Sequence, residues 1–387
     1  MYSGISGMKN FQTKLDVIGN NIANVNTYGF KKGRVTFKDT MNQTISGASA
    51  AQDNRGGKNP LQVGLGSTLA TIDTIHTQSS LQTTGRSLDL AISGDGYFIV
   101  NQGDAQFYTR AGNFYLDDNG TLVNGDGYKV QAFSVNADGS TSNQLGDVAV
   151  NVNAVLPAVK TSNIEFSGNL SLDSVVGGAP FTQQIQVVDA NGNSRRVDVH
   201  FKKQSATEWN VFLDKEATGT ASSVLTFDAT TGEFTSATQT NVDGFALDFS
   251  ALTQETGSTS ALVNPDGNTE GSLESFNIGS LGEVNGVYSN GLVRTLGVLA
   301  LAKFSNSSGL TKAGGNLFQE SINSGVANIN VAGEGRGSIA AGTLEMSNVD
   351  LSEEFTEMIS AQRGFQANTR IITTSDEILQ ELVNLKR

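Results

Sequence analysis

Residues 1–27 read MYSGISGMKNFQTKLDVIGNNIANVNT, and the pattern of this stretch decides the fold. Its apolar side chains alternate spacings of three and four residues, which is the seam of a coiled coil held for about two and a half heptads. The stretch contains no proline, and Gly29 follows it at a place where helices commonly stop. A helix with such a seam needs an apolar partner. The predicted seam residues are Met8, Phe11, Leu15, Ile18, Ile22 and Val25.

A second stretch with helical periodicity and no proline covers residues 347–387, SNVDLSEEFTEMISAQRGFQANTRIITTSDEILQELVNLKR. Either Asn348 or Ser352 is expected to cap this helix, and the glutamates that follow suit the positive end of its dipole. Apolar side chains recur every seven residues on one face, interrupted by polar positions, and a second apolar stripe lies on another face. A helix with two apolar faces has more than one partner. The predicted interface residues are Leu351, Phe355, Met358, Phe365, Ile371, Ile372, Ile378, Leu379 and Leu382.

The charges of the two chain ends favour their pairing. Residues 1–40 hold six basic and two acidic side chains, a net charge of +4, whereas residues 341–387 hold four basic and eight acidic side chains, a net charge of −4. Exposed ion pairs contribute only about 0–1 kcal/mol each, so this attraction favours the relative orientation of the two helices more than it stabilises their pairing. The alternative is that each helix packs separately on a globular body.

The residues between the helical stretches are rich in Gly, Asn, Ser and Thr and predict short strands joined by turns. A chain whose ends pair must go out and come back, so its domains are expected to be nested. The predicted fold class is therefore mainly β and multidomain, with an α-helical coiled-coil domain formed by the two chain ends. The expected divisions are a terminal helical domain of 1–27 and 347–387, a linker or extended segment of 28–67, a β-rich body of 68–145 and 286–346, and an inserted β-rich outer domain of 146–285.

The composition argues against several classes of function. The 387 residues carry a formal charge of −13, so a nucleic-acid binder that neutralises phosphates is not expected. The absence of cysteine excludes disulfide frameworks, thiolate metal sites and cysteine nucleophiles, and two histidines cannot supply a multi-histidine metal site. No apolar run of about 18 residues is available for membrane insertion, and the first residues lack the features of a cleaved signal peptide.

Local patterns that suggest chemistry are incomplete in this chain. SGDGYF, residues 93–98, lacks the third glycine and the following helix of a dinucleotide-binding turn. DANGN, residues 189–193, has EF-hand spacing, but the later Gly and Glu of a calcium loop are missing, so an Asx turn is expected. His76 and His200 are expected to be solvated strand residues, and Trp209 a core residue. No catalytic residue, metal site or cofactor is expected, and the protein is not expected to be an enzyme.

Both ends of the chain resemble one known family. LDVIGNNIANVNTYGFKKGRVTFKD, residues 15–39, closely resembles the N-terminal signature of bacterial flagellar axial proteins, the rod and hook family. Residues 342–387, with the SNVDL entry and the AQR-aromatic-QAN core, are similar to the C-terminal helix of the same family, and residues 84–116 resemble its body domain. Two long motifs in the right order at opposite ends make this a specific signal.

Within this family, the middle of the chain resembles hook proteins. FSGNLSLDS, IQVVDANGNSRRVDVHFKK and TEWNVFLD, between residues 166 and 214, look like the outer domain of hook members, whereas rod members are generally shorter. The long segment 41–66 is more reminiscent of the distal rod, which keeps a distal rod protein as the alternative. A secreted β-rich adhesin or binding module with helical ends is the alternative from a different class.

The resemblance implies a structural subunit rather than a catalyst. It implies a helical homopolymer, a curved tube that acts as a universal joint between rod and filament and encloses an export channel lined by the terminal helices. The implied partners are copies of the chain itself, the flagellar rod protein, the hook cap, the hook–filament junction protein and the flagellar type III export apparatus. The implied location is the extracellular hook, reached without a cleaved signal peptide, with no nucleic acid and no membrane insertion.

Overall fold

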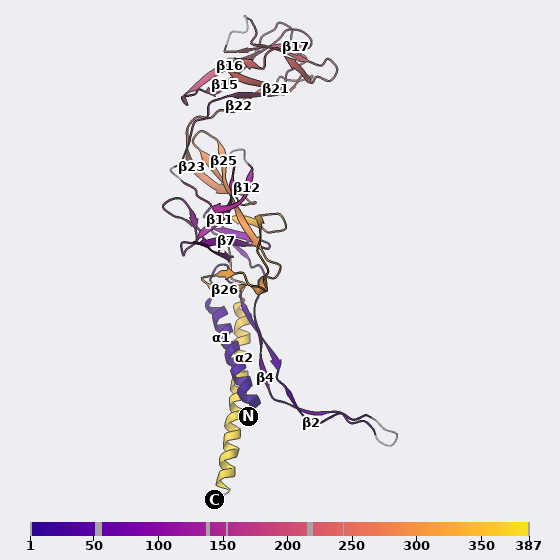
Figure 1. Cartoon of the computed structure of the whole chain (residues 1–387), viewed down its shortest axis with the longest axis vertical. Coiled ribbons are helices and arrows are strands. Elements are labelled where there is room, and N and C mark those ends of the chain that lie inside the picture. The colour runs from indigo at the N-terminus through magenta and orange to yellow at the C-terminus, as the bar shows by residue number, and fades with distance from the viewer. Residues whose placement is uncertain are drawn as a thin grey trace. The chain divides into compact units, whose positions relative to one another are not determined.

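The computed structural model describes residues 2–50, 56–136, 140–151, 154–214, 220–242 and 244–385. The described chain is mainly β, with one long helix near each end, and the two helices pack side by side (Figure 1). The predicted fold class is confirmed.

Two compact units make up the chain, and neither is continuous in sequence. The first comprises Met1–Val150, Asn277–Asn285 and Thr295–Arg387, and the second comprises Asn151–Phe276 and Gly286–Arg294. Strands β23 (Gly271–Ile278) and β24 (Glu283–Tyr288) pass from one unit to the other along the chain. This is a nested arrangement, and the limits of the four expected domains stay a prediction.

Helices α1 (Tyr2–Ala23) and α2 (Leu351–Asn384) run antiparallel in the first unit. Gly4, near the start of α1, lies beside Ile372, well along α2, whereas Lys14 pairs with Glu357 in the first turns of α2. Asp350 caps α2, because its side chain accepts hydrogen bonds from the backbone N–H groups of the second and third helical residues. The expectation that Asn348 or Ser352 caps this helix is wrong, since Asn348 binds the neighbouring strands instead.

The segment 28–67, expected to be a linker or extended segment, contains strands that form antiparallel pairs. Strand β1 (Gly33–Asp39) forms an antiparallel pair with β4 (Ser67–Thr74), and β2 (Asn42–Ser46) forms another with β3 (Leu61–Gly64). Alternation in these short strands is weak because both faces of the β2–β3 pair are exposed, so no apolar stripe marks them in the sequence.

The body of the first unit is an antiparallel sheet in the order β25–β11–β7–β8–β27–β26. β12 pairs with β11, and β28 pairs with β25. β10 pairs with β11 and with β9, and two short pairs, β29–β6 and β30–β5, complete the body. Its core gathers Tyr97, Tyr108, Phe304 and Phe318. The strands are β5 (Leu81–Thr83), β6 (Leu90–Ser93), β7 (Tyr97–Gln102), β8 (Ala105–Thr109), β9 (Tyr115–Leu116), β10 (Leu122–Val123), β11 (Lys129–Val135), β12 (Thr141–Asp147), β25 (Val293–Lys303), β26 (Thr311–Gly314), β27 (Leu317–Gln319), β28 (Asn328–Val331), β29 (Ser338–Ala341) and β30 (Thr343–Glu345), with a short 3-10 helix at Ser307–Gly309.

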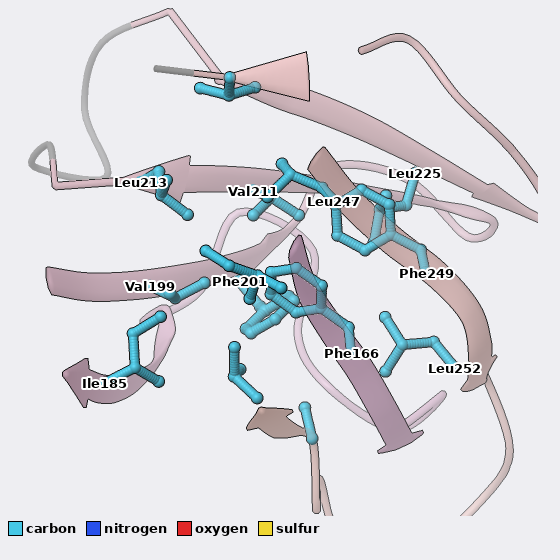
Figure 2. Close-up of a cluster of buried hydrophobic side chains, with 14 of the residues drawn as sticks. Phe166, Ile185, Val199, Phe201, Val211, Leu213, Leu225, Leu247, Phe249 and Leu252 are labelled. Carbon is cyan, nitrogen blue, oxygen red and sulfur yellow. The ribbon is translucent and has the colours of Figure 1, made fainter. Parts of the chain in front are cut away.

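The second unit encloses its own apolar core between two sheets, ordered β20–β21–β14–β22 and β15–β16–β17–β18–β19 (Figure 2). Phe166, Phe201 and Phe249 meet in this core, and Trp209 is 2% exposed, as expected. β15 and β16 form a hairpin whose turn is the expected Asx turn at Asp189. The strands are β13 (Val155–Leu156), which pairs with β23, β14 (Asn163–Asn169), β15 (Phe181–Val188), β16 (Ser194–Lys203), β17 (Glu208–Leu213), β18 (Ser223–Phe227), β19 (Phe234–Ala237), β20 (Asn241–Val242), β21 (Phe245–Thr253) and β22 (Leu262–Pro265).

Candidate functional site: the helix pair and the buried joint beside it

Small residues let the two helices approach closely. Phe11 of α1 packs on Gly364 of α2, where an added Cβ would lie 2.5 Å from the phenyl ring. Gly7 faces Asn368 in the same way, at 2.9 Å from the amide. The predicted seam of α1 therefore does face α2, but at glycine and asparagine as well as at apolar side chains.

Only one side of α2 is covered by α1. Ile18 is buried, and Met8, Phe11, Leu15 and Ile22 are half-buried, whereas Val25 lies in the turn after α1. On α2, Met358, Phe365 and Ile372 are half-buried. The other predicted interface residues of α2 are exposed: Leu351, Phe355, Ile371, Ile378, Leu379 and Leu382.

The C-terminal part of α2 extends past α1. Gly4 already lies beside Ile371 and Ile372, so residues 373–384, about 18 Å of helix, have almost no α1 to pack on. Ile378, Leu382 and Leu385 are more than half exposed in this part. Large apolar side chains that are exposed together on a helix are typical of an interaction surface.

Polar contacts fix the other end of the helix pair. Lys14 pairs with Glu357 at 2.9 Å and Lys32 with Glu353 at 2.7 Å, in the sense that the charges of the chain ends predict. Glu354 is buried, and burial raises its pKa although a hydrogen bond from Asn21 opposes that shift.

Asn21 ties α1 to the first strand. Its side chain accepts a hydrogen bond from Gly33 N and donates one to Gly33 O, so it imitates a paired strand. Asn348 joins the residue just before β1 to the residue just after β4. It accepts a hydrogen bond from Lys32 N at 2.7 Å and donates one to Ile75 O at 2.8 Å.

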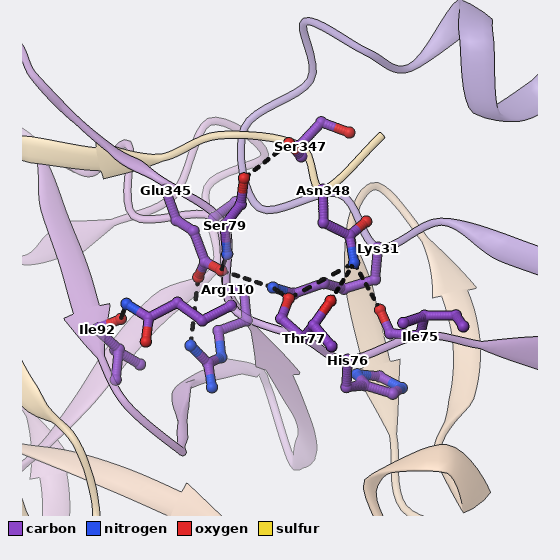
Figure 3. Close-up of polar contacts among 12 residues, drawn as sticks. Lys31, Ile75, His76, Thr77, Ser79, Ile92, Arg110, Glu345, Ser347 and Asn348 are labelled. Carbon is purple, nitrogen blue, oxygen red and sulfur yellow. Dashed lines mark hydrogen bonds and ion pairs between the residues drawn. The ribbon is translucent and has the colours of Figure 1, made fainter. Parts of the chain in front are cut away.

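A buried ionic joint lies beside the base of the helices (Figure 3). Lys31 Nζ binds Glu345 Oε1 at 2.6 Å, and Arg110 Nη1 binds Glu345 Oε2 at 3.2 Å. The side chains of Lys31 and Glu345 are both fully buried. Burial lowers the pKa of Lys31, while Glu345 acts in the opposite direction.

Backbone contacts complete this joint. Ser79 N donates to Glu345 Oε1, and Lys31 Nζ also donates to Thr77 O. Gly29 N donates to Glu345 O, and Gly29 has a positive φ of 71°. A Cβ at Gly29 would lie 2.5 Å from Ala111 N, so only glycine fits this crossing. The joint therefore holds together the segment after α1, the body sheet and the strand before α2.

His76 belongs to this joint, and the expectation of a solvated strand residue is wrong. It follows the end of β4, and its Nδ1 lies 2.7 Å from the Tyr97 hydroxyl. Its Nε2 is buried without a hydrogen-bond partner among the described residues. Burial, together with the positive charges of Lys31, Lys312 and Arg110, lowers the pKa of His76 to about 4. His200, by contrast, lies on β16 beside Thr182.

The part of the chain that the structure describes holds no group of His, Asp and Glu placed to bind a metal ion. Nor does any of its helices have the length and apolarity needed to cross a membrane.

Three family profiles match the chain. Their descriptions are "Flagella basal body rod protein" over residues 1–31, "Flagellar hook protein FlgE/F/G D1 domain" over residues 91–172, and "Flagellar basal body rod FlgEFG protein C-terminal" over residues 340–385. The chain has paired terminal helices with β units between them in sequence, and these profiles match both ends and the body. Together these features define a structural subunit of the flagellar axis.

Relatives match over the whole chain. The flagellar hook protein FlgE of Treponema pallidum is 37% identical and that of Borreliella burgdorferi 39%, each covering 100% of this chain and 99% of its own length. The flagellar basal-body rod protein FlgG of Bacillus subtilis is 42% identical and covers 100% of this chain and 98% of its own. The chain belongs to the flagellar hook and basal-body rod protein family. These matches favour the axial interpretation over a secreted adhesin.

A solved structure shares the fold. The Helicobacter pylori flagellar hook protein FlgE2 superposes with a TM-score of 0.52 at 14% identity, over 68% of this chain and 100% of that one. The Bacillus subtilis rod protein also matches this chain from end to end, so the full-length matches include both hook and rod proteins.

Proposed function

We propose that the protein is the hook subunit, which polymerises into a curved tube that transmits torque from rod to filament and encloses an export channel. The observation that carries the proposal is the projecting part of α2, where Ile378, Leu382 and Leu385 are exposed. Burying such side chains gains about 25 cal/mol per Å² of apolar area, and identical copies joined by non-closing contacts form a helical assembly.

The proposed assembly surface comprises both helices. Its members on α1 are the seam residues from Met8 to Val25, and its members on α2 are the exposed set from Leu351 to Leu382 together with the half-buried set that faces α1. The β units carry the contacts that change as the tube bends. Their polar surface suits hydrogen bonds that exchange with water, each with a net value of about 0.5–1.5 kcal/mol.

The proposed partners follow from this role. The subunit leaves the cell through the flagellar type III apparatus without a cleaved signal peptide, adds beneath the hook cap, and joins the rod protein at one end and the hook–filament junction protein at the other. A distal rod protein is the second candidate, supported by the full-length match to the Bacillus subtilis rod protein.

Complementation separates the two candidates. The gene is expressed in otherwise isogenic strains that lack either the hook gene or the distal rod gene, and hook–basal bodies are examined by electron microscopy. Curved hooks restored only in the hook-deficient strain support the proposal. Restoration of rods only in the rod-deficient strain would replace the hook assignment by the rod assignment.

A further inference from the structure

A cavity of about 240 Å³ lies between the end of α1, the segment that follows it and the β26–β27 hairpin. Its walls include Asn20 of α1, Asn24 and Lys31 of the following segment, and Lys312 and Phe318 of the hairpin. No acidic residue lines it. The wall of the cavity is partly polar, because amides and ammonium groups line it together with Phe30 and Phe318.

Lys312 brings a positive charge that no carboxylate balances. Its Nζ donates to Lys31 O at 3.1 Å and lies 5.1 Å from the centre of the Phe30 ring. No carboxylate of the described residues lies within ion-pair distance of it, and burial lowers its pKa. The nearby Lys31 and Arg110 share one carboxylate, Glu345. Glu345 is therefore already shared by two cations, and Lys312 has no carboxylate partner among the ion pairs of the described residues.

The ring of His76 packs near this cavity and close to the same cations. Its ring lies 5.4 Å from the ring of Phe318, which forms a wall of the cavity. After burial, the groups that lower its pKa are Lys31, Lys312 and Arg110, and the titratable Tyr97 on β7 donates or accepts at its Nδ1. A site where an imidazolium is disfavoured by several cations is one where an anion is favoured.

We propose that this cavity is a binding site for an oxyanion, either a free inorganic oxyanion or a carboxylate side chain of a second copy of the chain. The Lys312 ammonium supplies the charge. Asn20 Oδ1 already accepts a hydrogen bond from Asn24, which leaves the Asn20 amide nitrogen, unpaired within the described residues, to donate to the anion. This site does not depend on the proposed hook function, because it is formed within one chain.

The two histidines make the test direct, because His76 packs on Phe318, which forms a wall of the cavity, whereas His200 lies in the second unit. Their pKa values are measured by NMR on the full chain in sodium sulfate and in sodium chloride at equal ionic strength. Sulfate is expected to raise the pKa of His76 by about half a unit or more, since a nearby anion favours the imidazolium, and to leave His200 unchanged. An equal response of His76 in both salts overturns the proposal.

Three variants locate the effect. Lys312→Gln is expected to abolish the sulfate response, Lys312→Arg to keep it, and Lys38→Gln, which removes the same charge from the exposed end of β1, to leave it as in the wild type. A sulfate response that survives in Lys312→Gln overturns the proposal.

A dilution series without sulfate separates the two sources. If a carboxylate of a second copy fills the cavity, the pKa of His76 rises with protein concentration and added sulfate changes it little at high concentration. If the natural ligand is a free oxyanion, the pKa is independent of protein concentration and sulfate raises it throughout.

Discussion

At the scale of single residues, Glu345 has the most consequential position in the first unit. One carboxylate pairs with both Lys31 and Arg110, and all three side chains are almost entirely buried. Removing one partner of such a cluster leaves an uncompensated charge in a low-dielectric environment, which costs more than the ion pair itself contributes.

Glu345→Gln is therefore expected to lower the free energy of unfolding of the first unit by about 3–5 kcal/mol. Urea unfolding followed by far-UV circular dichroism measures this loss, and the fluorescence of Trp209, the single tryptophan, follows the second unit at the same time. Glu353→Gln is the matched control, because the Glu353 side chain is more than half exposed and its pair with Lys32 is worth about 1 kcal/mol or less. Equal losses in the two variants would contradict the role given to the buried joint.

His76 is expected to make the first unit less stable in mild acid. Its pKa is about 4 in the folded chain against 6.5 in the unfolded chain, so between these values the unfolded chain binds more protons. Its contribution is complete above about pH 6.5 and falls as the pH drops towards 4, by roughly 2–3 kcal/mol in total.

His76→Gln removes this dependence and His200→Gln does not. The measurement is the free energy of unfolding of each variant between about pH 4 and 7, compared with the wild type. A slope in His76→Gln equal to that of the wild type would assign the acid sensitivity to carboxylates alone.

These residue-scale features could not be read from the sequence. Lys31 and Glu345 are 314 positions apart, and nothing near either residue indicates that the other will meet it. His76 follows an alternating stretch, which suggested a solvated strand, but the strand ends at Thr74 and the ring turns against Tyr97 and Phe318. Burial decided by distant elements leaves no local periodicity.

At the scale of elements, the two ends of α2 have different tasks. Its first half is held by α1, by the Asp350 cap and by ion pairs, whereas its second half projects with exposed leucine and isoleucine side chains. Substitutions in the two halves should therefore separate stability from assembly.

Leu382→Asp is expected to abolish polymerisation and to change the stability of the monomer by about 0.5 kcal/mol or less, because the side chain is exposed in the single chain. Sedimentation and electron microscopy under assembly conditions test the first part, and thermal unfolding tests the second. Ser360→Asp, an exposed position in the first half of the same helix, is the control for added charge.

Ile18→Asp, by contrast, is expected to destabilise the monomer itself. Ile18 is 3% exposed within the single chain, so an unpaired carboxylate there costs several kcal/mol and weakens the helix pair before any assembly. If Leu382→Asp destabilises the monomer as much as Ile18→Asp, the projecting half of α2 packs within its own chain and the assembly role is wrong.

The elements differ in how far the sequence predicted them. The heptad spacing located both helices because each repeats its pattern over many turns. The pairing of β1 with β4 and of β2 with β3 was not predicted within the segment 28–67, expected to be a linker or extended, since residues such as Met41, Ile45 and Leu61 are exposed there and no buried face imposes alternation. The cap of α2 was placed two residues away from Asp350 because several capping residues stand close together in SNVDLS.

At the scale of the whole molecule, nesting makes the inserted part removable. Deleting residues 151–276, which lie within the second unit, and joining the ends is expected to spare export and tube formation but to alter the curvature of hooks, because the proposed helical contacts remain and the wet outer contacts are lost. Motility assays and microscopy of hooks from cells that carry the deletion measure the outcome. Absence of hooks would show that the inserted part holds the tube together, and hooks of unchanged curvature would remove its proposed role.

The arrangement of the whole chain was predictable because both ends carry long amphipathic patterns of opposite charge. Those patterns require the ends to meet, and nesting follows from that requirement. The middle could not be divided as well, because short strands between glycine and asparagine turns look alike in either unit.

The ionic joint at Glu345 also makes folding of the first unit depend on synthesis of nearly the whole chain. The ribosome synthesises Lys31 and Arg110 long before Glu345, and until that residue is made the two cations have no carboxylate at their site. A chain that stops short of residue 345 cannot bury them without the full cost of unpaired charge, and it also lacks the strand that binds Gly29. Truncated products are therefore expected to be digested by proteases that leave the full chain intact.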